Sequence, residues 1–317
     1  MRLTVLAAVV FCVSACASAP EPSDPEAFSR QAALSLTEEL SRDALFGRAP
    51  NTGGSTKAQD LVTARMATLG LIPLGEDGYR DPFVYGDFAD RETGESETPN
   101  LLGVNLIGKI EGRSDSSLAL VVTAHYDHVG VIEGEIYNGA DDNASGVGAL
   151  MAVAEYFTIA QPRYDVIIAA LDAEETGFHG ARALVLDPPL TSEVMAANLN
   201  LDMVARGDNG NLWASGASHT PALVPLIEAV AADAPVTLQM GFDTGEGRDD
   251  WTMLSDHAVF FRSGIPHLYL GVEDHDDYHT PRDDFSKIDQ AWFASSMETI
   301  VMVAAAMAED LDEIEKE

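Results

Sequence analysis

Seven residues of the types that bind zinc, or that support zinc ligands, follow one another along this chain in short polar clusters. In order they are His125, Asp127, Asp142, Glu174, Glu175, Asp202 and His279. The two cysteines, Cys12 and Cys16, both lie near the start of the chain, so a metal site in the folded part must use imidazole and carboxylate ligands. A carboxylate beside a metal can also move protons as a general base.

Most of these clusters follow an apolar run of the kind that forms a buried strand. Residues 118–124 run directly into His125, and residues 166–171 precede the acids at 174–175. Asp202 lies within a third such run, residues 197–203. Because an open α/β sheet builds its active site at the carboxyl ends of its strands, we expect these side chains to converge at one edge.

Strand and helix patterns alternate through most of the chain. We expect strands at 104–110, 118–124, 166–171, 197–203, 211–214 and 265–270, and helices at 32–44, 55–69, 146–157, 179–186, 221–232 and 289–311. Residues 77–100 are polar and favour a loop or irregular hairpin. The alternation predicts an α/β fold with three αβα layers, in which helices cover both faces of a mixed, mostly parallel central sheet.

Each cluster taken alone also has a plainer interpretation. His125 and Asp127 point to the same side of a strand, yet an isolated histidine of this kind is more often a surface or core residue. Asp141 and Asp142 precede a helix of small residues and could simply cap it. The paired acids at 174–175 favour metal chemistry, because neighbouring carboxylates with different orientations can divide metal binding and proton transfer between them.

Two further histidines lie near the clusters. His128 could be an alternative ligand, but in an extended chain it points away from His125, which favours a place in the pocket wall or behind the ligands. His275 and His279 are four residues apart, but Pro281 makes a helix with two ligands on one face improbable, and we take His279 as the ligand.

Six motifs in a fixed order resemble a known family. They are T-A-H-Y-D-H, N-G-A-D-D-N-A-S-G, D-A-E-E-T-G-F-H-G-A, N-L-D-M, S-D-H and Y-H-T-P. This order is similar to that of the cocatalytic dizinc metallopeptidases that include bacterial leucyl aminopeptidase, aminopeptidase S and glutamate carboxypeptidase, with glutaminyl cyclase as a relative. The resemblance covers the chain from about residue 36 onward and implies two Zn²⁺ ions per chain.

The resemblance also implies a role for each matching residue. His125 and Asp202 would bind one zinc, Glu175 and His279 the other, and Asp142 would bridge the two; Glu174 would be the general base, Asp127 the partner of His125, and Asp256 the partner of His279. A cis peptide bond would follow Asp142. The implied function is a zinc-dependent exopeptidase, an aminopeptidase that removes N-terminal residues from peptides by means of a hydroxide between the zinc ions.

Two alternatives stay open beside the aminopeptidase. One is a single-zinc transferase of the glutaminyl cyclase kind, and the other is a peptide-binding lipoprotein without catalysis. Arg248 could contact a substrate carboxylate, although a surface ion pair is the simpler interpretation. A net charge of −34, with 18 basic against 52 acidic residues, excludes a nucleic-acid partner because phosphate binding needs a basic surface.

The start of the chain has the pattern of a secretion signal. Arg2 precedes an apolar stretch at residues 3–13, and small residues lead to Cys16 as in a bacterial lipoprotein signal. We therefore predict a signal at 1–15, a flexible tether at 16–28, and one zinc peptidase domain at 29–317 without a protease-associated insert. The predicted location is the cell envelope, as an outer-membrane lipoprotein facing the periplasm or as a secreted protein, with membrane contact only through the lipid.

Overall fold

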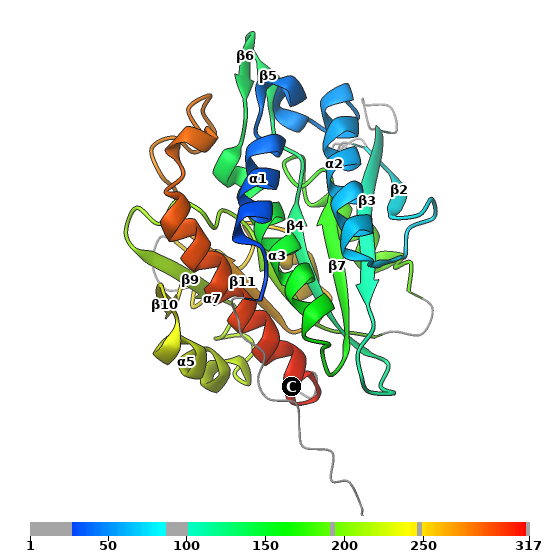
Figure 1. Cartoon of the computed structure of the whole chain (residues 1–317), viewed down its shortest axis with the longest axis vertical. Coiled ribbons are helices and arrows are strands. Elements are labelled where there is room, and N and C mark those ends of the chain that lie inside the picture. Colours follow the sequence, from blue (N-terminus) through cyan, green and yellow to red (C-terminus); the bar gives the residue numbers. More distant parts are fainter. Residues whose placement is uncertain (1–26, 87–100, 191–193, 246–248, 315–317) are drawn as a thin grey trace, which may run out of the picture.

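A mixed β-sheet forms the centre of the computed structural model, which describes residues 27–86, 101–190, 194–245 and 249–314 (Figure 1). Its nine strands are β1 (Ile72–Pro73), β2 (Arg80–Tyr85), β3 (Leu101–Ile110), β4 (Leu118–His125), β7 (Asp165–Leu171), β8 (Val194–Leu201), β9 (Asn211–Ser215), β10 (Thr237–Met240) and β11 (His267–Gly271). The strand order is β1-β3-β7-β4-β8-β11-β9-β10, and β2 also pairs with β3.

The four central strands β7, β4, β8 and β11 are parallel to one another. Antiparallel pairs flank them, with β3 beside β7 on one side and β9 beside β11 on the other. Parallel strands bring their carboxyl ends to the same edge of the sheet, which is the geometry needed to gather the polar clusters. This sheet, with helices on both faces, confirms the predicted α/β class.

The helices form two layers of unequal size. They are α1 (Arg30–Leu40), α2 (Gly53–Leu69), α3 (Gly146–Ile159), α4 (His179–Leu186), α5 (Leu223–Asp233), α6 (His257–Arg262), α7 (Gln290–Glu309) and α8 (Leu311–Ile314). α1, α2, α3, α5 and α7 cover the face seen in Figure 1, whereas α4 and α6 pack together on the other face. Short turns η1 (Asp43–Arg48), η2 (Ala140–Ser145) and η3 (Phe285–Lys287) connect them.

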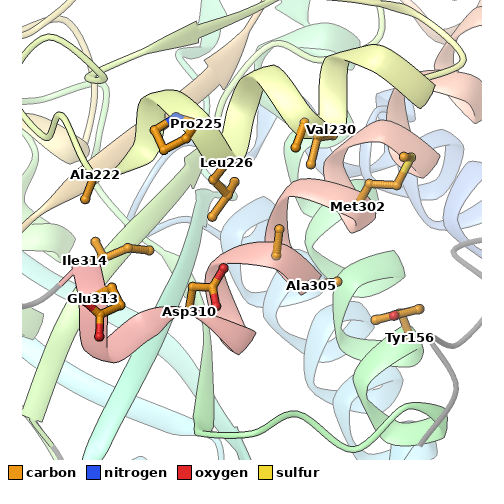
Figure 2. A pocket seen from close by; sticks show the side chains of 12 residues that line it. Tyr156, Ala222, Pro225, Leu226, Val230, Met302, Ala305, Asp310, Glu313 and Ile314 are labelled. Carbon is orange, nitrogen blue, oxygen red and sulfur yellow. The ribbon is translucent and has the colours of Figure 1, made fainter.

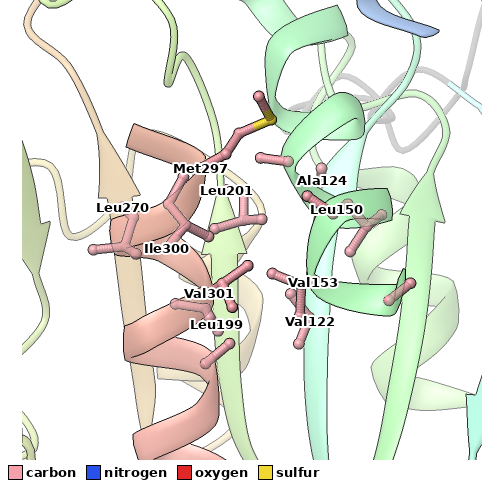
Figure 3. Packing of buried hydrophobic residues seen from close by; sticks show 14 of the residues in the cluster. Val122, Ala124, Leu150, Val153, Leu199, Leu201, Leu270, Met297, Ile300 and Val301 are labelled. Carbon is pink, nitrogen blue, oxygen red and sulfur yellow. The ribbon is translucent and has the colours of Figure 1, made fainter. Parts of the chain in front are cut away.

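The larger core lies where α3 and α7 pack on the middle of the sheet (Figure 3). Leu150 and Val153 of α3, together with Ile300 of α7, are fully buried and face strands β4 and β8. Burying one such side chain stabilises the fold by about 1.5–3 kcal/mol. This packing gives the carboxyl ends of β4 and β8 a rigid support.

Several elements differ from the prediction. β2 lies inside the stretch that we expected to be a loop or irregular hairpin, and the small hairpin of β5 (Gly130–Ile132) and β6 (Glu135–Tyr137), β10 and α6 have no counterpart in it. These elements have three to six residues each, too few for an apolar period to stand out. None of them supplies one of the seven residues in the polar clusters.

One helix of the described residues, α7, is long and apolar enough to cross a bilayer by length and composition alone. About 56% of its most apolar window is buried inside the fold, where it packs against α3 and α5. A core helix has the same properties, so this feature is weak evidence for a membrane span.

An apolar groove with a volume of about 680 Å³ lies between α5, α7 and α8 (Figure 2). Leu226 and Val230 of α5 line one side, and Met302 and Ala305 of α7 line the other. None of the groove's lining residues belongs to the polar clusters, so the groove is separate from the site described below.

Candidate functional site

The carboxyl ends of three neighbouring strands carry most of the candidate residues. β4 ends at His125, Asp202 directly follows β8, and the acids at 174–175 begin three residues past the end of β7. β4 lies between β7 and β8 in the sheet, so the three clusters meet at one edge, as expected. The two remaining candidates come from connecting segments: Asp142 lies in η2, and His279 lies between β11 and η3.

Two groups of described residues are close enough to hold a metal ion each. The His125 group consists of His125, Glu174 and Asp202, all buried. Nε2 of His125 lies 3.3 Å from Oδ1 of Asp202. The same nitrogen lies 3.4 Å from Oδ1 of Asp142, which belongs to the second group.

The His279 group consists of His128, Asp142, Glu175 and His279. Nε2 of His279 lies 3.0 Å from Oδ2 of Asp142 and 3.3 Å from Oε2 of Glu175. Nδ1 of His128 lies 2.6 Å from the other Glu175 oxygen, Oε1. The sequence left His128 open as an alternative ligand and favoured a place in the pocket wall, and the structure turns its ring towards this group.

Asp142 joins the two groups, because its Oδ1 faces His125 while its Oδ2 faces His279. Its neighbour Asp141 is turned away, and Oδ1 of Asp141 accepts hydrogen bonds from the Ser145 hydroxyl and the Ala205 backbone N–H. The peptide bond after Asp142 is cis, as the resemblance implied.

The donor atoms of both groups suit zinc. Zinc bonds to nitrogen and oxygen of about 2.0–2.2 Å in a tetrahedron place neighbouring ligand atoms roughly 3.3–3.6 Å apart. The contacts of His125 and His279 with the carboxylates span 3.0–3.4 Å. Several buried carboxylates so close together also need positive charge beside them, because a buried charge without a partner destabilises the fold.

Without metal, the charges of the site compensate one another. Burial lowers the pKa of His125, but the carboxylates of Asp202 and Glu174 outweigh burial and raise it well above its usual value. Burial raises the pKa of Asp142, yet His128, His125 and His279 together hold it well below the usual range. The imidazoles thus favour the ionised carboxylates, and an imidazole nitrogen must be free of its proton to bind a metal.

Glu174 has a different environment from Glu175. Burial, reinforced by Asp256, Asp202 and Glu175 against the opposing effect of His125, raises the pKa of Glu174 well above its usual value. The pKa of Glu175 is lowered, because hydrogen bonds from His128 and His279 outweigh burial and the repulsion of Asp142. Two adjacent carboxyl groups whose pKa values move in opposite directions are suited to different tasks.

Asp127 connects the end of β4 with the paired glutamates. Its carboxylate lies 3.6 Å from Nδ1 of His125. The two carboxylate oxygens also accept hydrogen bonds from the backbone N–H groups of Glu174, at 3.1 Å, and Glu175, at 3.4 Å. Asp127 therefore fixes the backbone that carries both glutamates, in addition to the contact with His125 that the resemblance implied.

Two residues that the sequence analysis did not single out hold the loop before Asp142. The Asp283 carboxylate accepts hydrogen bonds from the backbone N–H groups of Asp141 and Asp142. Arg48 is fully buried and donates to the backbone carbonyls of Asn138 and Gly139, as well as to those of residues 40 and 126. Their sequence signal is weak, because a side chain that bonds only to backbone leaves no pattern of matched residue types.

Asp256 is fully buried at the start of α6. Burial raises its pKa to about 8, opposed by His125 and reinforced by Asp127 and Asp202. The charges that act on Asp256 are therefore those of the His125 group and its neighbour Asp127, and its support of His279 stays a prediction.

Of the other two open residues, His275 and Arg248, the structure describes the first. Nε2 of His275 lies 3.3 Å from Oδ2 of Asp141, so His275 belongs to neither metal group of the described residues. Arg248 lies outside the described residues.

Residues 105–304 match Peptidase family M28. The chain belongs to this family. Its members are zinc-dependent peptidases, and the match confirms the family that the ordered motifs indicated.

The chain is similar to several curated proteins. It is 30% identical over 217 residues to a vacuolar membrane protease of Clavispora lusitaniae, covering 66% of this chain and 20% of that protein. A vacuolar membrane protease of Schizosaccharomyces pombe is 28% identical over 195 residues, which cover 59% and 21% of the two chains. The chain thus spans about a fifth of the length of these relatives.

Solved structures with the same fold include enzymes of two kinds. The zinc aminopeptidase BSAP of Bacillus subtilis has a TM-score of 0.70 at 17% identity, and the match covers 89% of this chain and 96% of that one. Glutaminyl cyclase of Porphyromonas gingivalis has a TM-score of 0.66 at 20% identity, covering 87% and 98%. At these identities the similarity establishes the fold alone.

The relatives contradict the predicted location. We predicted an outer-membrane lipoprotein facing the periplasm, or a secreted protein, but the curated relatives in question are fungal proteases named for the vacuolar membrane. The signal-like pattern at residues 1–15 and Cys16 lie outside the described residues, and no comparison supports a lipid anchor. A short apolar stretch followed by small residues was therefore too weak a basis for the location.

Proposed function

We propose that this chain is a dizinc exopeptidase, an aminopeptidase that hydrolyses N-terminal residues from peptides. The observation that carries the proposal is the position of Asp142, whose two oxygens face two separate groups of ligands. His125 and Asp202 would complete one zinc site, and Glu175 and His279 the other. The names of structural neighbours such as BSAP support the aminopeptidase activity.

The site also has a suitable proton carrier. When bound, the zinc ions would lower the pKa of a water molecule and polarise the peptide carbonyl. Glu174 would accept the proton of the attacking water at its carboxylate and return it to the departing amine. Its backbone is held by Asp127, so the carboxyl group keeps a fixed position while the proton moves.

The extent of the domain is part of the same proposal. We propose that residues 29–317 form one catalytic domain without a protease-associated insert. Within the described residues one continuous sheet runs from β1 at one edge to β10 at the other, and the strands that position both metal groups belong to it.

A matched pair of variants tests the function. Glu174→Gln should still bind two zinc ions per chain but release amino acids from aminoacyl anilides at least ~10²-fold more slowly, because it has lost the proton carrier. Glu133→Gln, in the exposed β5–β6 hairpin, is the control and should keep the parent rate. Parent-like turnover by Glu174→Gln would refute the assigned role.

Metal content separates the alternatives. Two zinc ions per chain together with chelator-sensitive release of amino acids support the proposal. One zinc ion per chain together with ring closure of N-terminal glutamine would favour a transferase like the glutaminyl cyclase neighbour instead. Peptide binding without turnover would leave only a binding role.

A further inference from the structure

His128 occupies a position that the implied set of five ligands does not explain. Its side chain is completely buried and lies against Glu175 and Asp142. The remaining ring nitrogen, Nε2, is buried and has no hydrogen-bond partner in the described structure. A fully buried imidazole directed at two carboxylates is either a metal ligand or a hydrogen-bond donor to one of them.

The two imidazoles of the His279 group approach the same carboxylates from different sides. Nδ1 of His128 lies 2.6 Å from Oε1 of Glu175 and 3.7 Å from Oδ2 of Asp142. Nε2 of His279 contacts the other Glu175 oxygen and the same Asp142 oxygen. The two rings are 5.7 Å apart and inclined by 60°, and one donor atom from each of the four residues lies within 4.8 Å of the others.

Gly139 holds the His128 ring in this orientation. A Cβ atom added to Gly139 would lie 2.5 Å from Cδ2 and 2.6 Å from Cγ of His128, so the backbone of Gly139 packs closely against the ring. Gly139 also has a φ of 53°, in the left-handed region that favours glycine. The ring therefore cannot swing away from the carboxylates without moving the loop that carries Asp142.

We propose that His128 binds the second metal through Nδ1, which gives this site four protein ligands: His128, Asp142, Glu175 and His279. Two imidazoles and two carboxylates would hold this zinc, and the water would be a fifth ligand, a coordination number that catalytic zinc can reach. The 2.6 Å contact between Nδ1 and Oε1 of Glu175 is a hydrogen bond, so metal binding would have to widen it to the spacing of two zinc ligands. The other site has only His125 and Asp202 besides the shared Asp142. The two metals should consequently bind in order, with the four-ligand site filling first. This inference rests on the proposed dizinc site.

The protonation of Nδ1 decides between a ligand and a hydrogen-bond donor. A ligand nitrogen carries no proton, so bound metal requires the tautomer protonated at Nε2. The full chain, with ¹⁵N-labelled histidine and loaded with ¹¹³Cd²⁺, should show scalar coupling between ¹¹³Cd and Nδ1 of His128. The resonance is assigned by its loss in His128→Asn. If Nδ1 instead keeps a bonded proton in the metal-loaded protein, the proposal is overturned.

The same variant gives an independent measurement. The side-chain amide introduced by His128→Asn can replace a hydrogen bond to Glu175 but is a poor zinc ligand. Chelator competition with Zn²⁺ should show one site weakened more than ~100-fold, beyond the 10–100-fold that loss of a residue supporting a ligand typically costs. His219→Asn, which changes an exposed imidazole bonded to Thr252, should leave both affinities unchanged. Parent-like affinity in His128→Asn would contradict the proposal.

The outcomes also distinguish this inference from the proposed function. If the wild-type chain binds two metals and releases amino acids while Nδ1 of His128 carries a proton, only the role of His128 is wrong. If the wild-type chain does not bind two metals, both proposals are wrong.

Discussion

His257 is a buried neutral histidine whose protonation should limit the stability of the fold in acid. Its Nε2–H donates to the carbonyl of Trp251 at 2.8 Å, whereas Nδ1 is buried without a partner. Burial, reinforced by the neighbouring His267, lowers the pKa of His257 from 6.5 to about 3. Protonation in the folded state would place a charge on Nδ1 where no acceptor receives it.

The sign follows from which state binds the proton. Between pH 6.5 and pH 3 the unfolded chain is protonated at His257 and the folded chain is not, so stability is full above pH 6.5 and is lost as the pH falls. In this range each unit by which the pH falls lowers the free energy of unfolding by about 1.4 kcal/mol. Two units, down to about pH 4.5, therefore remove roughly 2–3 kcal/mol from the free energy of unfolding.

The substitution His257→Gln removes this titration and keeps an N–H donor for the Trp251 carbonyl. We expect the variant to have a lower free energy of unfolding than the parent at about pH 8. Between that pH and about pH 4.5, the free energy of unfolding of the variant should fall by roughly 2–3 kcal/mol less than that of the parent. Urea unfolding of both proteins at several pH values, with chelator present to keep metals off, measures the difference.

The control is Phe260→Leu, a buried change on the same helix α6 that removes no titrating group. The difference in free energy of unfolding between Phe260→Leu and the parent should be the same at every pH. If the difference between His257→Gln and the parent is equally independent of pH, the histidine is not the source of the acid sensitivity and the reasoning is wrong.

Two further substitutions test the support of the site. Arg48→Met should lower the free energy of unfolding by at least about 3 kcal/mol, because the substitution leaves four buried carbonyls without their donor. Urea unfolding at neutral pH measures this loss. A loss below about 1 kcal/mol would contradict the prediction. Gly139→Ala should weaken zinc binding at least ~10-fold, because the added methyl group would clash with the His128 ring and the Asp142 carbonyl. Chelator competition measures the affinity for zinc. An unchanged affinity would contradict the prediction and show that the loop can adapt.

The residues placed correctly from sequence share one property. His125, Asp202 and the acids at 174–175 each come at or directly after an apolar run long enough to be recognised as a buried strand. The direction of a parallel strand then fixes the edge of the sheet at which they lie. Their convergence could therefore be predicted without side-chain detail.

The residues that were missed or misplaced depend on packing between distant segments. Asp283 and Arg48 bind backbone groups, and any residue can offer those, so no pairing of residue types reveals them. β4 ends at His125, so the alternation of side chains along a strand, on which the prediction for His128 depended, does not extend to it. Asp256 lies at the start of the short helix α6, which the sequence analysis did not detect, and its support of His279 stays a prediction.

The supports of the site are independent of the metals. Asp127 and Asp283 accept hydrogen bonds from backbone N–H groups of the loops they hold, and Arg48 donates to backbone carbonyls. Arg48 is also a buried cation whose field reaches Asp142, Asp127, Asp283 and Glu175. These bonds hold the backbone of the loops without using any proposed metal ligand atom, so the positions of the ligands depend on them as well as on the metal.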